Sequence, residues 1–178
     1  MRKNPLALLG LPASGAVYLV IRELGHLIAC SALGVPFSIV LKSGFLPTIA
    51  AGVEPTDLTT TAQAWLIMSG PIAGLLVGYV LLVLIARRRS PASVFVRLLA
   101  AMTCYLTLIL DPIYYTIIPI FSLGGEPERL ANLLGVPISK VQMIAIVLLL
   151  TNSILSRRIA VPFFKGDPPS GSAPAAAP

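Results

Sequence analysis

Charged residues are scarce in this chain of 178 residues, of which 11% are Asp, Glu, Lys or Arg and 56% are hydrophobic. An ordinary soluble domain carries roughly 25% charged residues. A soluble globule of this length cannot hide so much apolar surface from water. The scarcity of charge therefore excludes a soluble domain and indicates an integral membrane protein.

Histidine and cysteine are also rare, with one histidine and two cysteines in the whole chain. The single histidine, His26, rules out a zinc site made from two histidines of one subunit. Cys30 and Cys104 both lie inside apolar stretches, which argues against a disulfide framework. We expect both cysteines to be small packing residues.

Basic residues exceed acidic ones by 13 to 7, but they flank the apolar stretches and form no patch interleaved with aromatic residues. This arrangement is typical of membrane topology and argues against nucleic-acid binding. Nine of the basic residues lie at the two termini and in the 87–97 connection, against three on the opposite side. The charge distribution predicts four spans with both termini in the cytoplasm.

Four apolar stretches predict transmembrane helices at about 6–33, 65–86, 95–121 and 141–156. The segment after the first span is rich in Pro, Gly and β-branched residues, so we expect it to be extended and to lie in the interface or re-enter the bilayer. The fold class is an all-α polytopic membrane protein with a short extended or re-entrant segment. A single membrane domain is expected over 1–165, followed by a disordered low-complexity tail over 166–178.

Three glycines in the second span, Gly70, Gly74 and Gly78, are spaced four residues apart. This spacing places small residues on one face of a helix and permits close approach of a neighbouring helix. We expect the glycine stripe to serve packing within the chain, with a dimer interface as the alternative.

Ionisable residues inside predicted spans are the main functional signal, because charge at membrane depth is costly. Arg22, Glu23 and His26 occur in the first span and Asp111 in the third. At about 100° per residue, Arg22, His26 and Glu23 lie at roughly 0°, 40° and 100° around the helix. We expect this face to point into the protein and Arg22 to form an ion pair with Asp111, with or without Glu23.

Three segments together resemble the site-2 protease family of intramembrane zinc metalloproteases. RELGHLIACSALGVP at 22–36 is similar to the family's HExxH helix, and SGPIAG at 69–74 is similar to its Gly-Pro motif. Asp111 stands where the family has its third zinc ligand. The resemblance implies that Glu23 matches the general base, His26 the second zinc ligand and Asp111 the third.

The match departs from the family at the first ligand, where Arg22 replaces histidine. Arginine has no lone pair to offer a metal and its charge repels Zn²⁺. Gly74 also stands where the family often has Asn, and no Gly follows Asp111 directly. Zinc is therefore expected to be absent. The alternative is a metal held by Glu23 and His26 together with Asp111 or Cys30.

The expected function is that of a catalytically impaired site-2 protease-like protein, which binds or modulates a transmembrane partner among the lipids of a membrane, expected to be the cell membrane. One alternative is an active zinc endopeptidase with unconventional ligands that cleaves a transmembrane substrate. Another is a small transport or channel component. The resemblance also implies an N-terminus outside the cytoplasm, opposite to the prediction from the charges.

Overall fold

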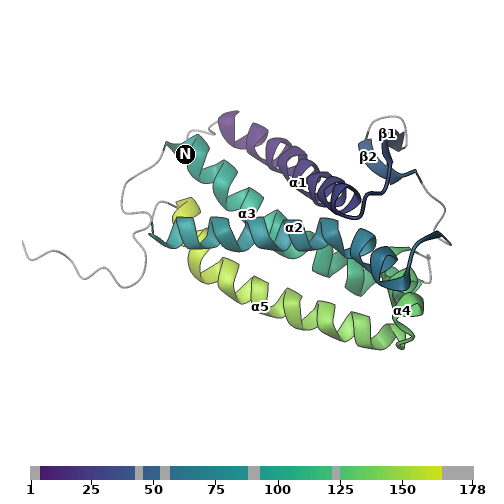
Figure 1. Cartoon of the computed structure of the whole chain (residues 1–178). Coiled ribbons are helices and arrows are strands. Elements are labelled where there is room, and N and C mark those ends of the chain that lie inside the picture. Colours follow the sequence, from purple (N-terminus) through teal and green to yellow (C-terminus); the bar gives the residue numbers. More distant parts are fainter. Residues whose placement is uncertain (1–4, 43–45, 53–56, 88–92, 122–124, 166–178) are drawn as a thin grey trace, which may run out of the picture.

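A computed structural model describes residues 5–42, 46–52, 57–87, 93–121 and 125–165 of the chain (Figure 1). Four long helices form the bundle: α1 (Pro5–Ala32), α2 (Thr60–Arg87), α3 (Val94–Ile117) and α5 (Ile138–Lys165). The smaller elements are the strands β1 (Phe37–Lys42) and β2 (Leu46–Ala51), the 3-10 helix η2 (Ile118–Phe121) and the short helix α4 (Glu126–Leu134). The predicted tail at 166–178 and positions 88–92 of the basic connection lie outside the described residues.

The four long helices are each long and apolar enough to cross a membrane. A helix of about 20 residues spans the hydrocarbon core of a bilayer, and each candidate span has at least 24 residues. Large apolar side chains such as Leu76, Val80 and Ile144 remain more than half exposed on the outer faces of the bundle, as expected for surfaces that face lipid. The prediction of an all-α polytopic membrane protein is confirmed.

The four long helices alternate in direction along the chain, so the bundle has two distinct ends (Figure 1). The β1–β2 hairpin and α4 lie at one end, where α1 ends and α5 begins. The beginning of α1, the connection from α2 to α3 and the end of α5 lie at the other. Because α4 begins with Glu126 and is packed against the bundle through buried Leu130 and Ala131, it brings an acidic side chain to the hairpin end.

The segment after α1 is a two-stranded antiparallel hairpin in which Ile39 pairs with Ile49 and Phe37 with Ala51. The expectation of an extended segment is thus confirmed. The side chains of Phe37, Ile39 and Val40 are 44%, 68% and 43% exposed, so one strand presents an apolar surface. β2 returns along α1, which brings its backbone within hydrogen-bonding reach of Glu23.

Helix α5 (Ile138–Lys165) extends beyond both ends of the predicted 141–156 stretch, and within that stretch it carries two polar residues, Asn152 and Ser156, that are both 0% exposed. The side-chain amide of Asn152 donates to the Leu108 carbonyl at 2.7 Å, and the Tyr79 hydroxyl donates to Asn152 Oδ1 at 2.6 Å. Polar side chains that are paired inside a bundle are compatible with a membrane span. Asn152 therefore forms a buried polar contact between α2, α3 and α5 inside the span.

Candidate functional site

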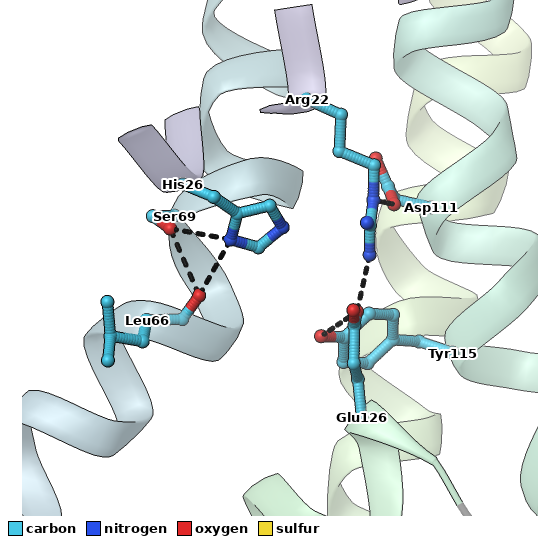
Figure 2. A network of polar contacts seen from close by, with 7 residues as sticks. All are labelled: Arg22, His26, Leu66, Ser69, Asp111, Tyr115 and Glu126. Carbon is cyan, nitrogen blue, oxygen red and sulfur yellow. Dashed lines mark hydrogen bonds and ion pairs between the residues drawn. The ribbon is translucent and has the colours of Figure 1, made fainter. Parts of the chain in front are cut away.

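Arg22 lies at the centre of a charged cluster that joins three helices (Figure 2). Its Nε is 3.3 Å from Asp111 Oδ1 on α3, and its Nη2 is 2.5 Å from Glu126 Oε2 at the start of α4. The side chains of Arg22, Asp111 and Glu126 are 17%, 4% and 26% exposed. We call these three residues the Arg22 cluster. Its guanidinium divides its donors between two carboxylates instead of binding one of them bidentately.

Two tyrosines border the Arg22 cluster. The Tyr115 hydroxyl donates to Glu126 Oε2 at 3.5 Å, and the Tyr18 hydroxyl interacts with the Asp111 carboxylate. Asp111 Oδ2 is nevertheless buried without a partner at ordinary hydrogen-bond geometry among the described residues. It faces Gly74, where an added Cβ would lie 3.3 Å from it. Oδ2 of Asp111, the most buried carboxylate of the cluster, is thus an acceptor without a hydrogen-bond donor in the described part of the chain.

The Arg22 cluster has a formal charge of −1, because one guanidinium faces two carboxylates. Water can partly hydrate Glu126, whose side chain is a quarter exposed. Asp111 has no comparable access to solvent, and uncompensated charge in a membrane interior is costly. The excess negative charge is therefore least compensated at Asp111.

The His26 ring lies between α2 and the side chain of Arg22, with its Nδ1 edge toward Leu66 and Ser69 (Figure 2). Its Nδ1 is 2.8 Å from the Leu66 carbonyl oxygen and 3.1 Å from Ser69 Oγ. A carbonyl oxygen only accepts, so Nδ1 carries the proton that is donated to Leu66. In the neutral ring the lone pair is then on Nε2, which packs against Gly70.

Glu23 contacts the hairpin instead of the Arg22 cluster. Its Oε2 accepts a hydrogen bond of 2.6 Å from the Ile49 backbone amide in β2. The three motif residues of α1 therefore serve three neighbours: Arg22 reaches α3 and α4, His26 reaches α2, and Glu23 reaches β2. The expected ion pair of Arg22 with Asp111 is present, whereas Glu23 contacts β2 instead of joining that pair.

The candidate zinc ligands do not fit a zinc site as they are arranged. Arg22 places a cation against Asp111, Glu23 is engaged by a backbone amide, and His26 is turned toward α2. Within the described ranges, no group of three or more His, Cys, Asp or Glu side chains is placed to hold a metal ion. Cys30 is buried with a free thiol, as is Cys104, whose Sγ is 3.5 Å from the Gly78 carbonyl oxygen.

The glycine stripe of α2 lies against other helices of the same chain. A Cβ on Gly70 would clash with His26 and with Arg22 Cγ, and one on Gly78 would lie 2.7 Å from Leu108 and Thr107. Gly74 lies between these two positions and faces Asp111. The stripe thereby allows α1 and α3 to approach α2 closely at the level of the Arg22 cluster.

Glu126 was missed by reasoning from the sequence because it lies outside the apolar stretches. Acidic residues in the first turn of a helix are common, since they interact favourably with the helix dipole, so Glu126 carried no special signal. Tyr18 had a clearer one, because it precedes Arg22 by four residues and therefore shares its helix face. The number of carboxylates around Arg22 could not be deduced from spacing.

A groove of ≈ 540 Å³ lies beside the Arg22 cluster and has walls from α2 and α5. Its lining includes Pro71 and Leu75 of α2, Ile144 and Leu148 of α5, and Tyr115 of α3. Asp111 and Lys140 are the charged side chains among the described residues that line it. We call it the α2–α5 groove.

Comparisons of this chain with family models, with curated protein sequences and with solved structures find no match in any of the three. The resemblance to the site-2 protease family is therefore carried by the segments at 22–36 and 69–74 and by Asp111 alone.

Proposed function

We propose that this chain is a site-2 protease-like protein of the cell membrane that does not cleave peptide bonds and instead binds a transmembrane segment of a partner protein. The observation that supports the proposal is the position of the Arg22 guanidinium between Asp111 and Glu126. A protein cation thus takes the place that the resemblance assigns to zinc.

Loss of catalysis follows from the chemistry of these side chains. Zinc bound to Asp111 would have to displace Arg22 from a carboxylate, leaving a buried guanidinium with one partner fewer. Glu23 would have to give up its hydrogen bond to the hairpin in order to act as a base. Both changes are unfavourable, so the arrangement favours a permanent ion-pair cluster.

Partner binding is supported by the α2–α5 groove, which is apolar along its walls and lies between two helices that cross the membrane. Grooves between helices are common sites for amphipathic or apolar helices. The groove is adjacent to the Arg22 cluster, so a bound segment would lie close to the residues that in an active relative would perform catalysis.

The second candidate function is an active zinc endopeptidase with unconventional ligands. The orientation of His26 favours it, because histidines that bind metals typically donate their second ring N–H to a carbonyl or carboxylate. His26 donates through Nδ1 to Leu66, which leaves Nε2 as its potential ligand atom. Glu23 or Asp111 would then have to exchange its present partner for the metal.

Elemental analysis of the detergent-purified protein tests the proposal. We expect far less than one zinc per chain, before and after incubation with a small excess of zinc. About one zinc per chain that is lost in the His26→Ala variant would contradict the proposal and favour the endopeptidase.

A gain-of-binding experiment tests whether Arg22 is the residue that prevents metal binding. We expect Arg22→His to acquire zinc, because it adds a ligand and removes the competing charge. Arg22→Gln is the matched control, since it removes the charge without adding a ligand of comparable strength, and it should remain metal-free. Equal zinc contents in the two variants would argue against this role of Arg22.

A further inference from the structure

The size of the α2–α5 groove limits what it can hold. An α-helix with its side chains is about 10–12 Å wide, so a helical segment that entered fully would need more than the ≈ 540 Å³ present. Side chains from one face of a helix that lies across the opening would fit. This is the usual packing of a helix on a groove, in which ridges of side chains fill the space between two neighbouring helices.

Asp111 makes this groove different from an ordinary apolar surface. Its side chain is 4% exposed, lines the groove, and has Oδ2 without a hydrogen-bond partner among the described residues. Arg22 cannot satisfy both carboxylates fully, because its donors are divided between Oδ1 of Asp111 and Glu126. The groove thus combines apolar walls with a buried carboxylate of the negatively charged Arg22 cluster, and Lys140 is the second charged residue in its lining.

We propose that the α2–α5 groove binds a partner transmembrane helix that presents one basic side chain, Lys or Arg, to the Asp111 carboxylate. This inference rests on the proposed function and specifies the chemistry of the partner. A basic side chain would supply the missing donor and bring the charge of the Arg22 cluster to zero. Ionisable residues inside membranes pair with one another in this way.

The depth of Asp111 specifies where the basic residue lies in the partner helix. Asp111 precedes the end of η2 at Phe121 by ten residues, which corresponds to about 15 Å along a helix. That is roughly half of the ~30 Å hydrocarbon core. The partner's basic residue is therefore expected near the middle of its apolar stretch, where the acyl chain of a lipid would offer no hydrogen-bond donor.

Synthetic transmembrane peptides test this inference with the whole protein in phosphatidylcholine nanodiscs. The probes are Leu-Ala helices of about 20 residues with a central Lys, Leu or Glu, each carrying a quencher and no tryptophan. Trp65 is the only tryptophan of the chain and is 52% exposed. It lines the groove and also a second pocket between α1 and α2, so its quenching reports a peptide bound beside α2, and the variants below assign the peptide to the groove. We expect the Lys peptide to bind about tenfold more tightly than the Leu peptide, and the Glu peptide more weakly than either.

Two pairs of measurements locate the binding. Asp111→Asn preserves the size of the side chain and should bring the Lys and Leu peptides to within about twofold of each other. Ile144→Phe narrows the groove and should weaken the Lys peptide. Ile146→Phe is the matched control, because Ile146 is exposed on the same helix outside the groove lining, and it should have no effect. The two phenylalanine variants keep the test decisive if Asp111→Asn does not fold.

Equal binding of the Lys and Leu peptides to the wild-type protein would overturn the inference. So would displacement of both peptides by added lipid, which would indicate a groove filled by acyl chains, or self-association of the protein that Ile144→Phe abolishes, which would indicate a second copy as the occupant. None of these outcomes bears on zinc content. The elemental analysis above therefore separates failure of this inference from failure of the catalytically inactive assignment.

Discussion

The bundle contains two buried polar clusters that differ in charge and in completeness. In one of them Asn152 receives the Tyr79 hydroxyl and donates to the Leu108 carbonyl, so both ends of its amide are used. In the other, Arg22 joins Asp111 and Glu126, and Asp111 Oδ2 is left without a partner. The first cluster links α2, α3 and α5, and the second links α1, α3 and α4.

The difference between the clusters separates a structural role from a functional one. Neutral hydrogen bonds between membrane helices contribute about 0.6–2 kcal/mol each and have no further requirement once paired. Removing one partner of a buried ion pair costs roughly 3–5 kcal/mol. A cluster that remains charged and incompletely paired beside a groove is therefore the better candidate for binding, and the Asn152 cluster is the better candidate for holding the bundle together.

The largest expected effect is that of Arg22→Met, which leaves both carboxylates without their cation. Asp111 would then be buried with no compensating charge, so we expect a loss of roughly 3–5 kcal/mol in the free energy of unfolding. Thermal unfolding in detergent measures it. A loss below about 1 kcal/mol would be typical of an exposed ion pair and would contradict the assignment of a buried cluster.

Asp111→Leu is expected to be milder than Arg22→Met, because Arg22 keeps its contact with Glu126. The double variant should recover much of the loss caused by Arg22→Met, since the orphaned carboxylate is gone. Strictly additive losses in this double-mutant cycle would show that Arg22 and Asp111 are not coupled.

The sequence indicated the bundle well because membrane spans depend on long apolar stretches, a signal that needs no tertiary information. The high free-energy cost of a charged side chain inside a membrane likewise indicated Arg22 and Asp111 as functional candidates from the sequence alone. Glu126 could not be found in this way, because it lies outside the spans and approaches Arg22 only through the packing of α4. Asn152 lies inside the predicted span 141–156, but an uncharged amide there gave no sign of the Tyr79 and Leu108 contacts that the packing of α2, α3 and α5 brings to it.

The separation of Glu23 from the Arg22 cluster also could not be predicted from the sequence. Helical angles place Glu23 about 100° from Arg22, which leaves open whether both face the same neighbour. The hairpin decides this, because β2 offers the Ile49 amide to the Glu23 carboxylate. Loop backbones that fold back on a helix leave no periodic pattern from which such a contact could be predicted.

Asn152→Leu tests the structural cluster and should have an intermediate effect. The leucine leaves the Tyr79 hydroxyl and the Leu108 carbonyl without their present partner, so we expect a loss of about 1–2 kcal/mol in the free energy of unfolding. Thr151→Leu is the matched control, since Thr151 is exposed next to it on α5, and it should be close to neutral. A loss as large as that of Arg22→Met would remove the distinction between the two clusters.

The smallest expected effect is local and concerns the contact between Glu23 and the hairpin. Glu23→Met removes the acceptor of the Ile49 amide, and a hydrogen bond to a charged group contributes about 1.5–3 kcal/mol. We therefore expect hydrogen exchange at Ile49 to accelerate at least about tenfold, with little change in the melting temperature of the bundle. Glu23→Gln retains an acceptor oxygen and should accelerate exchange much less. If Glu23→Met instead lowered the melting temperature as much as Asp111→Leu, Glu23 would belong with Arg22 and Asp111, and the charge of that cluster would have to be counted again.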